Sequence, residues 1–409
     1  MLNLIWLAFF FIAAFCGFYQ WLVLGNQAIF TELVSAMFDM AKVTVEIALG
    51  LVGALCLWLG IFKIAEHNGW IARLSRLLTP LFQRLMPEVP ANHPAVGSIT
   101  MNLSANALGL DNAATPLGIK AMQDLQTLNP NKTTASNAQI LFLVLNTSSV
   151  TLFPVFVFVY RAQQGAAIPT DVFLPILITT SCSSIAGLIA VALVQRINLL
   201  QQTVLLYGAL FFALMGGLLV YFVSLPAALV GPQSSLLANL LIFCFVVGVL
   251  FSAWRQKLDT YDLFIEGAKE GFQQAINLIP YLLAMLVAIG LLRASGAIQL
   301  VVDAIAWLVS LAGLSTAFVD ALPTALMKPL SGSGARAMMI ETMQVHGADS
   351  FAGRLSGIFQ GSTETTFYVL AVYFGAVGIK HSRHAIPCAL IADATAIIVG
   401  IVVASVFFA

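Results

Sequence analysis

The stretch LLYGALFFALMGGLLVYFVSL, residues 205–225, decides the class of fold. It contains no charged residue and is long enough to cross the hydrocarbon core of a bilayer as a helix, which takes about 20 residues. Of the 409 residues in the chain, 60% are hydrophobic and only 9% are charged. A soluble domain of this size could not cover so much apolar surface with a polar shell. The composition therefore predicts an all-α integral membrane protein that crosses the bilayer many times.

Further apolar stretches of comparable length bring the expected number of transmembrane helices to about nine. They cover residues 2–24, 43–62, 140–160, 172–194, 236–254, 275–292, 355–379 and 388–408. The first of them has neither a basic leader region nor a small-residue cleavage site, so we expect it to stay in the protein as a membrane helix. Residues 298–314, which carry a single acid at Asp303, are a candidate for an additional span.

Two moderately apolar stretches, residues 94–125 and 319–343, are interrupted by Gly, Pro, Asn and Ser and contain no clean span. Irregular backbone survives at membrane depth only where protein or water satisfies its polar groups. We therefore predict two re-entrant or broken-helix hairpins that line a cavity. Residues 70–85, just before the first hairpin, carry three arginines among leucines, which is typical of an amphipathic helix at the membrane surface.

The second half of the chain resembles the first in the order of its motifs. The segment SSVT at 148–151 aligns with TETT at 363–366, and PLGIKAM at 116–122 resembles the segment 329–338. An odd number of expected spans separates the starts of the two repeats, so the repeats should have inverted topology. Inverted repeats with broken helices are typical of secondary transporters, whose binding site lies at the repeat interface.

These patterns divide the chain into four parts. We expect an N-terminal helix and loop at 1–40, a first repeat at 41–199, a linker of two helices at 200–267 and a second repeat at 268–409. With the N-terminus in the cytoplasm and nine crossings, the 18 basic residues divide 12 to 6 in favour of the cytoplasmic side. Basic residues favour that side, so we expect the C-terminus outside.

Polar residues gather in four places within these apolar stretches, where each costs free energy unless it is used or paired. The residues expected to bind a solute are Asn102, Ser104, Asn106, Asn112, Thr115, Asn146, Thr147, Ser148, Ser149, Lys328, Ser331, Gly332, Ser333, Gly334, Arg336, Gln360, Ser362, Thr363 and Thr365. The alternative is that the Asn residues form turns and that Ser and Thr bond the backbone of their own helices.

The cluster at 328–336 combines helix-breaking Pro and Gly with two basic residues, Lys328 and Arg336. Exposed backbone N–H groups at the start of a half-helix can hold an anionic group. Arg336 has an alternative role, because a long basic side chain can reach the membrane surface and leave only its stem in the apolar region.

Glu364, inside the expected span 355–379, is the most informative single residue. A carboxylate in an apolar segment either binds a proton or pairs with a cation. We expect Glu364, together with Asp393 in the last span, to bind a coupling ion, H⁺ or Na⁺. A structural ion pair between Glu364 and Lys328 or Arg336 is the alternative.

Other kinds of chemistry find no support in the sequence. It has no H-E-x-x-H motif, no Ser/His/Asp arrangement and no Walker loop, so we expect neither an enzyme nor a bound cofactor. The five cysteines are scattered singly through apolar runs, and His381 with His384 forms only an H-x-x-H pair between two spans. We therefore expect no metal site. The net charge of zero gives no indication of a nucleic-acid partner.

The polar clusters also carry a resemblance to known proteins. Residues 102–122, NLSANALGLDNAATPLGIKAM, resemble the spore maturation protein A family, whereas 329–335 (PLSGSGA), 360–368 (QGSTETTFY) and 371–375 (AVYFG) resemble spore maturation protein B. The chain is thus similar to a fusion of the two from about residue 41 onward. Both belong to the nucleoside recognition, or Gate-domain, group, which is similar to parts of concentrative nucleoside transporters and of a ferrous iron transporter.

The resemblance implies a bacterial inner-membrane protein with two paired, inverted Gate repeats. The leading hypothesis is a secondary transporter that moves a small polar solute by alternating access, the solute being nucleoside-like, amino-acid-like or a small carboxylate. One alternative is a non-transporting scaffold or regulator of envelope or spore maturation. Another is an ion or metal permease. The expected partners are the solute, H⁺ or Na⁺, the lipid bilayer and, as an open alternative, further copies of the chain.

Overall fold

The computed structural model describes residues 2–108, 111–311, 313 and 315–408. Within them the regular structure is helical, apart from a single bridge between Thr134 and His381. The first half contains α1 (Leu2–Leu22), α2 (Ile29–His67), α3 (Trp70–Leu85), α4 (Pro94–Ala107), α5 (Asp111–Leu128), α6 (Asn137–Thr147), α7 (Val155–Gln163) and α8 (Phe173–Gln195). This confirms the expected all-α membrane class.

The linker and the second half of the chain are also helical. They contain α9 (Gln202–Val223), α10 (Ala227–Arg255), α11 (Thr260–Ala294), α12 (Ala297–Leu311), a 3₁₀ turn η1 (Val319–Ala321), α13 (Leu322–Met327), α14 (Gly332–His346), α15 (Phe351–Ser362), α16 (Thr366–Gly375) and α17 (Ala385–Phe408). Among the described residues, α2, α8, α9, α10, α11 and α17 contain stretches long and apolar enough to cross a membrane. The apolar part of α1 is shorter, and α12 is too short to be an additional span.

Two of the expected spans are not continuous helices. The span expected at 140–160 is divided into α6 and α7, and the one expected at 355–379 is divided into α15 and α16. The first break ends at Pro154, which precedes the first residue of α7 and lacks the N–H that a helix interior would use. The second break is extended at Thr363, with φ −143° and ψ 167°. At the first break, the carbonyl of Ser149 accepts a bond from the hydroxyl of Thr180 on α8.

The order of elements from α2 to α8 occurs again from α11 to α17. Each series has a long helix, a helix of 15 or 16 residues, a hairpin, a broken helix and a final long helix. The hairpins α4–α5 and α13–α14 occupy the positions expected for re-entrant segments. The expected domain limits at residues 40 and 267 lie within α2 and α11, and the division into domains stays a prediction.

Equivalent helices of the two series pack side by side and run antiparallel. Gly60 of α2 lies against Phe264 of α11, and Met40 lies against Gly290, so residue numbers rise along one helix as they fall along the other. The final helices behave alike, because Ser183 bonds the carbonyl of Ala392 and Gln195 contacts His384. Antiparallel pairing of equivalent helices is the arrangement that inverted repeats produce.

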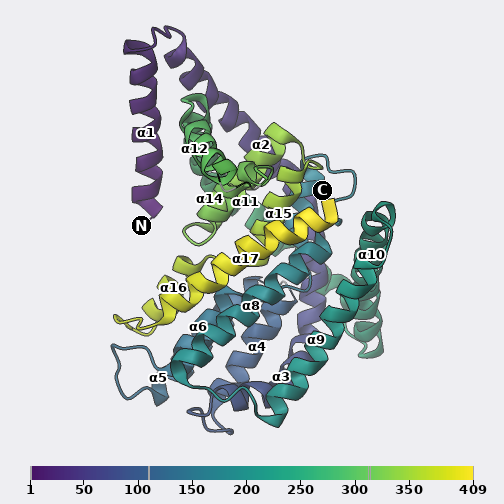
Figure 1. Cartoon of the computed structure of the whole chain (residues 1–409). Helices are drawn as coiled ribbons and strands as arrows, with labels where there is room; N and C mark the ends of the chain where they lie inside the picture. The colour runs from purple at the N-terminus through teal and green to yellow at the C-terminus, as the bar shows by residue number, and fades with distance from the viewer. Residues whose placement is uncertain (1, 109–110, 312, 314, 409) are drawn as a thin grey trace.

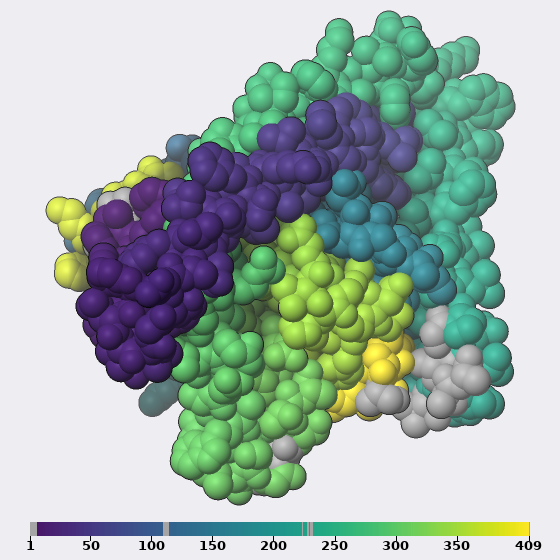
Figure 2. All heavy atoms as spheres, turned by 90° about the horizontal axis from the view of Figure 1, so that it is seen from above, coloured from purple at the N-terminus to yellow at the C-terminus, as the bar shows by residue number. Residues whose placement is uncertain are grey.

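Figure 1 shows how these pairs are arranged: α8 and α17 lie side by side in the middle, α9 and α10 lie at one edge, and α1 and α12 lie at the other. Figure 2, seen from above, shows the purple N-terminal helices bordering the green residues of the second half. Large apolar side chains are exposed along α9 and α10, for example Leu210 and Phe243. Such exposure is stable only against lipid or another apolar surface.

The segment between α2 and α4 has the predicted amphipathic character. In α3 the buried residues are Ile71, Ser75, Phe82 and Leu85, whereas Arg73, Arg76 and Arg84 are exposed. The helix begins after Gly69, whose φ of +80° allows the chain to turn sharply from α2. The arginines therefore lie on the face turned away from the core.

Candidate functional site

The ends of the half-helices meet in the interior of the molecule. Leu152, in the first break, donates its N–H to the carbonyl of Ala107 at the tip of α4, at 2.8 Å. Phe367, the matching residue of the second repeat, donates to the carbonyl of Pro329 at 3.0 Å. Each break is thus bound to the tip of its own hairpin.

A third backbone bond joins the two repeats to each other. The N–H of Glu364, in the second break, donates to the carbonyl of Thr147, at the end of α6, at 2.8 Å. Helix ends expose unsatisfied carbonyl and N–H groups, and here those groups are partly satisfied across the repeat interface. The two breaks are therefore neighbours, and together with the hairpin tips they form the candidate site.

A network of amide side chains lies on the first-repeat side of this meeting point. Asn106 Nδ2 donates to Asn146 Oδ1 at 2.8 Å, and the hydroxyl of Tyr373 donates to the same oxygen at 3.3 Å. Asn102 Nδ2 donates to the Tyr373 hydroxyl at 3.3 Å and to the carbonyl of Ala114 at 2.7 Å. Three elements of the first repeat and α16 of the second are joined in this way.

Two features hold Tyr373 in this network. Its ring stacks on that of Phe142 with centroids 5.7 Å apart. Its hydroxyl reaches over Gly118, where an added Cβ would lie 2.1 Å from the Tyr373 oxygen.

The side-chain oxygen of Asn102 is buried without a partner among the described residues. Such an atom costs free energy unless something bonds it, so it is a group that can accept a bond from a solute.

The second-repeat side of the meeting point is charged. Lys328, which is only 6% exposed, donates from Nζ to the carbonyl of Gln360 at 2.8 Å. Asp393, 5% exposed, accepts a bond from Thr366 at 2.7 Å through Oδ2, and its Oδ1 is buried with no partner in the described part of the chain. Lys328, Thr363 and Asp393 line one small pocket with apolar neighbours from α13, α15 and α17.

The two repeats use different chemistry at matching places. In the first, a hairpin-tip amide, Asn106, bonds the end of α6 through Asn146; in the second, Lys328 bonds the end of α15 through Gln360. On α8, Thr180 bonds the carbonyl of Ser149 in the first break, whereas on α17 the group that faces the second break is Asp393. The first repeat is therefore neutral where the second is charged.

Several residues of the expected site turn out to satisfy their own backbone. Ser104, Thr147, Ser148 and Ser362 bond carbonyl groups one turn earlier in their helices. Ser149 is buried in the break, where its carbonyl accepts the bond from Thr180, and Thr115 is half-buried. The side chain of Asn112 lies outside the described residues. These observations place the residues near the site without giving them contacts to a solute.

The start of α14 contributes backbone rather than charge. Ser331 caps the helix by accepting a bond from the N–H of Gly334 at 3.0 Å, and its hydroxyl also lies 3.3 Å from that of Ser333. An added Cβ on Gly332 would lie 2.7 Å from Thr365 Oγ1, so glycine allows the hairpin to approach the second break. Arg336 donates to the carbonyl of Gly332 at 3.2 Å.

Glu364 is half-buried at the crossing of the two breaks. The salt bridges among the described residues include none between its carboxylate and Arg336. Its N–H bond to Thr147 places it next to Asn146 and hence beside the amide network. A carboxylate in this position can receive a cation or a hydroxyl-bearing solute.

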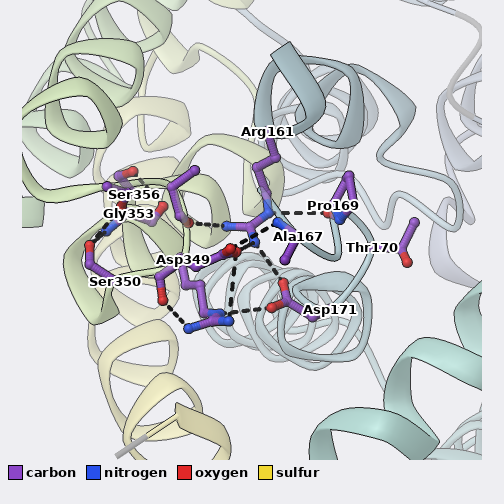
Figure 3. Close-up of polar contacts among 12 residues, drawn as sticks. Arg161, Ala167, Pro169, Thr170, Asp171, Asp349, Ser350, Gly353 and Ser356 are labelled. Atoms are coloured by element: carbon purple, nitrogen blue, oxygen red, sulfur yellow. Dashed lines mark hydrogen bonds and ion pairs between the residues drawn. The ribbon is translucent and has the colours of Figure 1, made fainter. Parts of the chain in front are cut away.

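A cluster of four charged residues, here called the ionic cluster, was not expected from the sequence. It comprises Arg161, Asp171, Asp349 and Arg354 (Figure 3). Arg161 is completely buried, and its guanidinium contacts Asp171 at 2.9 Å and Asp349 at 3.2 Å. Arg354 contacts Asp171 at 2.7 Å. The cluster joins the segment after α7 to the segment before α15, and hence the first repeat to the second.

Backbone groups surround the same cluster. Arg161 donates to the carbonyls of Ala348 at 2.8 Å and Pro169 at 3.1 Å, and Asp349 accepts from the N–H of Ala167 at 2.8 Å. Figure 3 shows the side chain of Arg161 turned toward Asp171 and Asp349. A buried charge is stable only when it is paired and hydrogen-bonded, and the Arg161 guanidinium has two carboxylate partners and two carbonyl partners.

At the other end of the molecule, the loop before α6 meets the loop before α17 through hydrogen bonds of the backbone. We call these bonds, between residues 133–135 and 380–383, the backbone contact. Lys380 and His381 both donate their N–H groups to the carbonyl of Thr133, and Ala135 donates to the carbonyl of His381 at 3.0 Å. Arg383 adds a bond to the carbonyl of Ala135 at 3.0 Å. Asp171 precedes α8 and Gln195 ends it, next to His384. The two contacts therefore lie at opposite ends of a helix about 34 Å long.

Comparison with known proteins follows the same division into two parts. The family model described as "Gate: Nucleoside recognition" matches residues 48–163 and 275–380. Spore maturation protein A of Bacillus subtilis (strain 168) is 44% identical over 154 residues, which are 38% of this chain and 79% of that protein. Spore maturation protein B of the same organism is 42% identical over 163 residues, 40% of this chain and 90% of that protein.

No solved structure matches the chain. The two matched segments of the family model begin in α2 and α11 and include both hairpins and both broken helices, which are the elements that form the site. Together the segments cover more than half of the sequence. The chain therefore belongs to the Gate family of nucleoside recognition membrane proteins, as its sequence motifs predicted.

Proposed function

We propose that this protein is a secondary transporter that moves a small polar solute across the membrane by alternating access. The observation that carries the proposal is the meeting of two broken helices and two hairpin tips around polar side chains inside an otherwise apolar molecule. Polar groups at membrane depth are costly, and they are typical of a substrate path. Discontinuous helices that meet at a repeat interface are the common form of such a path.

The two end contacts support alternation. Alternating access needs a closure on each side of the site, so that one can open while the other stays shut. The ionic cluster joins the α7–α8 loop to the α14–α15 loop, and the backbone contact joins the equivalent pair, the α16–α17 and α5–α6 loops. The two contacts lie at opposite ends of α8. The pocket between them holds about 10 Å³, roughly the space of one water molecule. Both contacts are formed in this structure.

The chemistry of the site favours a neutral solute with hydroxyl and amide groups. Asn102, Asn106, Asn146 and Tyr373 offer both donors and acceptors. The description of the matching family model, nucleoside recognition, agrees with such a solute. Nucleosides are therefore the first class to test, followed by amino acids and small carboxylates.

The experiment is a thermal-shift screen of the purified full-length protein against nucleosides, amino acids, small carboxylates and divalent metal ions, with sodium and pH varied. A ligand at about 100 times its Kd stabilises the native state by about 2.7 kcal/mol, which raises Tm measurably. Asn146→Ala, which removes the centre of the amide network, should abolish the shift. A positive solute is then tested for uptake into proteoliposomes.

The outcomes separate the candidate functions. A shift with a polar solute and uptake of that solute would support the transporter. A shift with a metal ion alone would indicate a permease instead. The absence of any shift would favour a scaffold or regulator, for which the buried amide network has no evident use.

A further inference from the structure

The second repeat has charged side chains, Lys328 and Asp393, where the first repeat has the neutral side chains Asn106 and Thr180. Packing alone does not require this difference. The Oδ1 of Asp393 is buried with no partner among the described residues, and Asp393 and Lys328 line the same pocket. The positive charge of Lys328 acts on the Asp393 carboxylate in the pocket that both residues line. The pair is held by different elements, α17 and the tip of the α13–α14 hairpin.

The residues that line the pocket favour a proton over a sodium ion as the ion bound by Asp393. A bound sodium ion needs several oxygen ligands, as hard cations generally do. The side-chain oxygens that line the pocket come from Asp393 and Thr363, and the rest of the lining is Ala325, Pro329, Phe359, Ala396 and Ile397 beside Lys328. A proton needs one oxygen, and an apolar lining favours the neutral, protonated carboxyl group.

We propose that Asp393 is the site that binds the coupling proton and that Lys328 is its movable counter-ion. This proposal rests on the transport function above and specifies its coupling ion. With the hairpin in place, the ammonium of Lys328 stabilises the ionised carboxylate. When the α13–α14 hairpin moves during transport, Lys328 leaves the pocket, and the carboxylate takes up one proton from water to become neutral. Return of Lys328 releases that proton.

The charged groups around Asp393 are few. The elements packed against α17 include α6, α8, α10, α15 and α16. Their titratable and charged residues are Arg354 at the outer end of α15, which is bound to Asp171, Cys244 and Arg255 on α10, Cys182 on α8, and Tyr368 and Tyr373 on α16. Glu364 precedes α16 and lies beside Tyr373. Lys328 is the charged side chain that shares the pocket lining with Asp393.

The test is infrared spectroscopy of the full-length protein in lipid nanodiscs, which detects protonated carboxyl groups directly and needs no solute. Lys328→Met keeps the length of the side chain and removes its charge, so it should give one additional protonated carboxyl group per chain at neutral pH. Lys328→Arg keeps the charge and should match the wild type. Lys328→Met combined with Asp393→Asn should lose the additional signal.

A matched control distinguishes Asp393 from the other carboxylate of the site. Adding Glu364→Gln to Lys328→Met should leave the additional signal unchanged. The proposal is wrong if Lys328→Met shows no additional protonated carboxyl group, or if the signal survives Asp393→Asn. It is also wrong if sodium chloride, compared with choline chloride, removes the signal, because the pocket would then be a sodium site.

This readout separates the coupling proposal from the transport proposal. A protein that moves no solute would still give the additional signal if Asp393 binds the proton, so the proton site would stand and the transport function would fail. Conversely, if a solute is transported and Asp393→Asn leaves the dependence of uptake on a proton gradient unchanged, transport would stand and the proton site would be wrong.

Discussion

Glu364 shows how a single side chain can be placed by backbone chemistry. Its N–H is bound to Thr147 of the opposite repeat, which fixes the residue at the crossing of the two broken helices. Its side chain is left half-buried beside the amide network. The position of the carboxylate thus depends on a bond between the repeats rather than on side-chain packing.

We predict that Glu364→Gln keeps the fold and loses most solute uptake, because the amide has nearly the same shape and lacks the charge. Uptake into proteoliposomes measures the effect, and the elution profile in detergent checks the fold. Glu46→Gln is the matched control, since Glu46 is 63% exposed and pairs only with Lys42 at 4.0 Å among the described residues. Uptake at the wild-type rate in Glu364→Gln would remove this carboxylate from the mechanism.

Individual residues were the easiest part of the site to anticipate and their partners the hardest. Asn102, Asn106 and Asn146 stand out in sequence because amides in apolar segments are costly. Tyr373 does not, because tyrosine is ordinary in such a segment, and only the fold brings it to Asn146. Arg161 is fully buried, because Asp171 and Asp349 come to it from different parts of the chain.

Among the elements, the two glycine-lined surfaces of α2 and α11 control how closely the repeats approach. An added Cβ on Gly271 would lie 2.5 Å from the carbonyl oxygen of Leu55, and one on Gly267 would lie 2.3 Å from that of Leu59. Both obstacles are backbone atoms, which cannot rotate away as a side chain can. The long antiparallel pair therefore depends on the absence of side chains at these positions.

We expect Gly271→Ala to destabilise the protein by about 1–3 kcal/mol, the usual cost of overpacking. Thermal unfolding in detergent measures the change. Gly53→Ala on α2 is the control, because a Cβ there would meet nothing within 4 Å; in a helix interior that change should stabilise by about 0.5–1 kcal/mol. Equal shifts in Tm for both variants would contradict the packing argument.

The ionic cluster gives a second prediction at this scale. Asp349→Asn removes the charge that holds the loop 164–172 to the loop 347–350 through Arg161 and Ala167. Amide hydrogen exchange in both loops should become faster, whereas exchange at 133–135 and 380–383 should not change. Asp320→Asn is the control, because Asp320 contacts only His346, at 4.0 Å, among the described ion pairs. Unchanged exchange in 164–172 would show that the cluster does not close this end.

Hydropathy predicted the elements well where they are continuous and failed where they are broken. A window of about 20 residues averages Ser148–Thr151 with the apolar residues on either side, so the break disappears from the profile. The hairpins were easier to anticipate, because Pro and Gly interrupt them visibly. What the sequence could not give is the pairing of the two breaks, which depends on backbone bonds between residues more than 200 positions apart, Thr147 and Glu364 among them.

For the whole molecule, the chain order gives nine crossings if each broken helix counts once. These are α1, α2, α6–α7, α8, α9, α10, α11, α15–α16 and α17. With the cytoplasmic N-terminus favoured by the basic residues, the C-terminus would lie outside. The loop between α10 and α11 would then lie in the cytoplasm, between the two repeats.

This topology is testable with reporter fusions in bacterial cells. Alkaline phosphatase joined after residue 409 should be active, and green fluorescent protein inserted in the loop 256–259 should fluoresce. The reciprocal pair, with the reporters exchanged, should be inactive and dark, because each reporter works on one side of the membrane only. A fluorescent fusion at the C-terminus would place that end in the cytoplasm and would change the number of crossings.

The antiparallel seam of α2 and α11 has a consequence for how the molecule is made. Two separate polypeptides would have to find each other in the bilayer before this seam could form, and their amounts would have to match. In the present chain α9 and α10 tether the halves, so the local concentration of one half around the other is on the order of millimolar or higher. One gene thus guarantees equal numbers of both halves, and assembly no longer depends on how much protein the membrane contains.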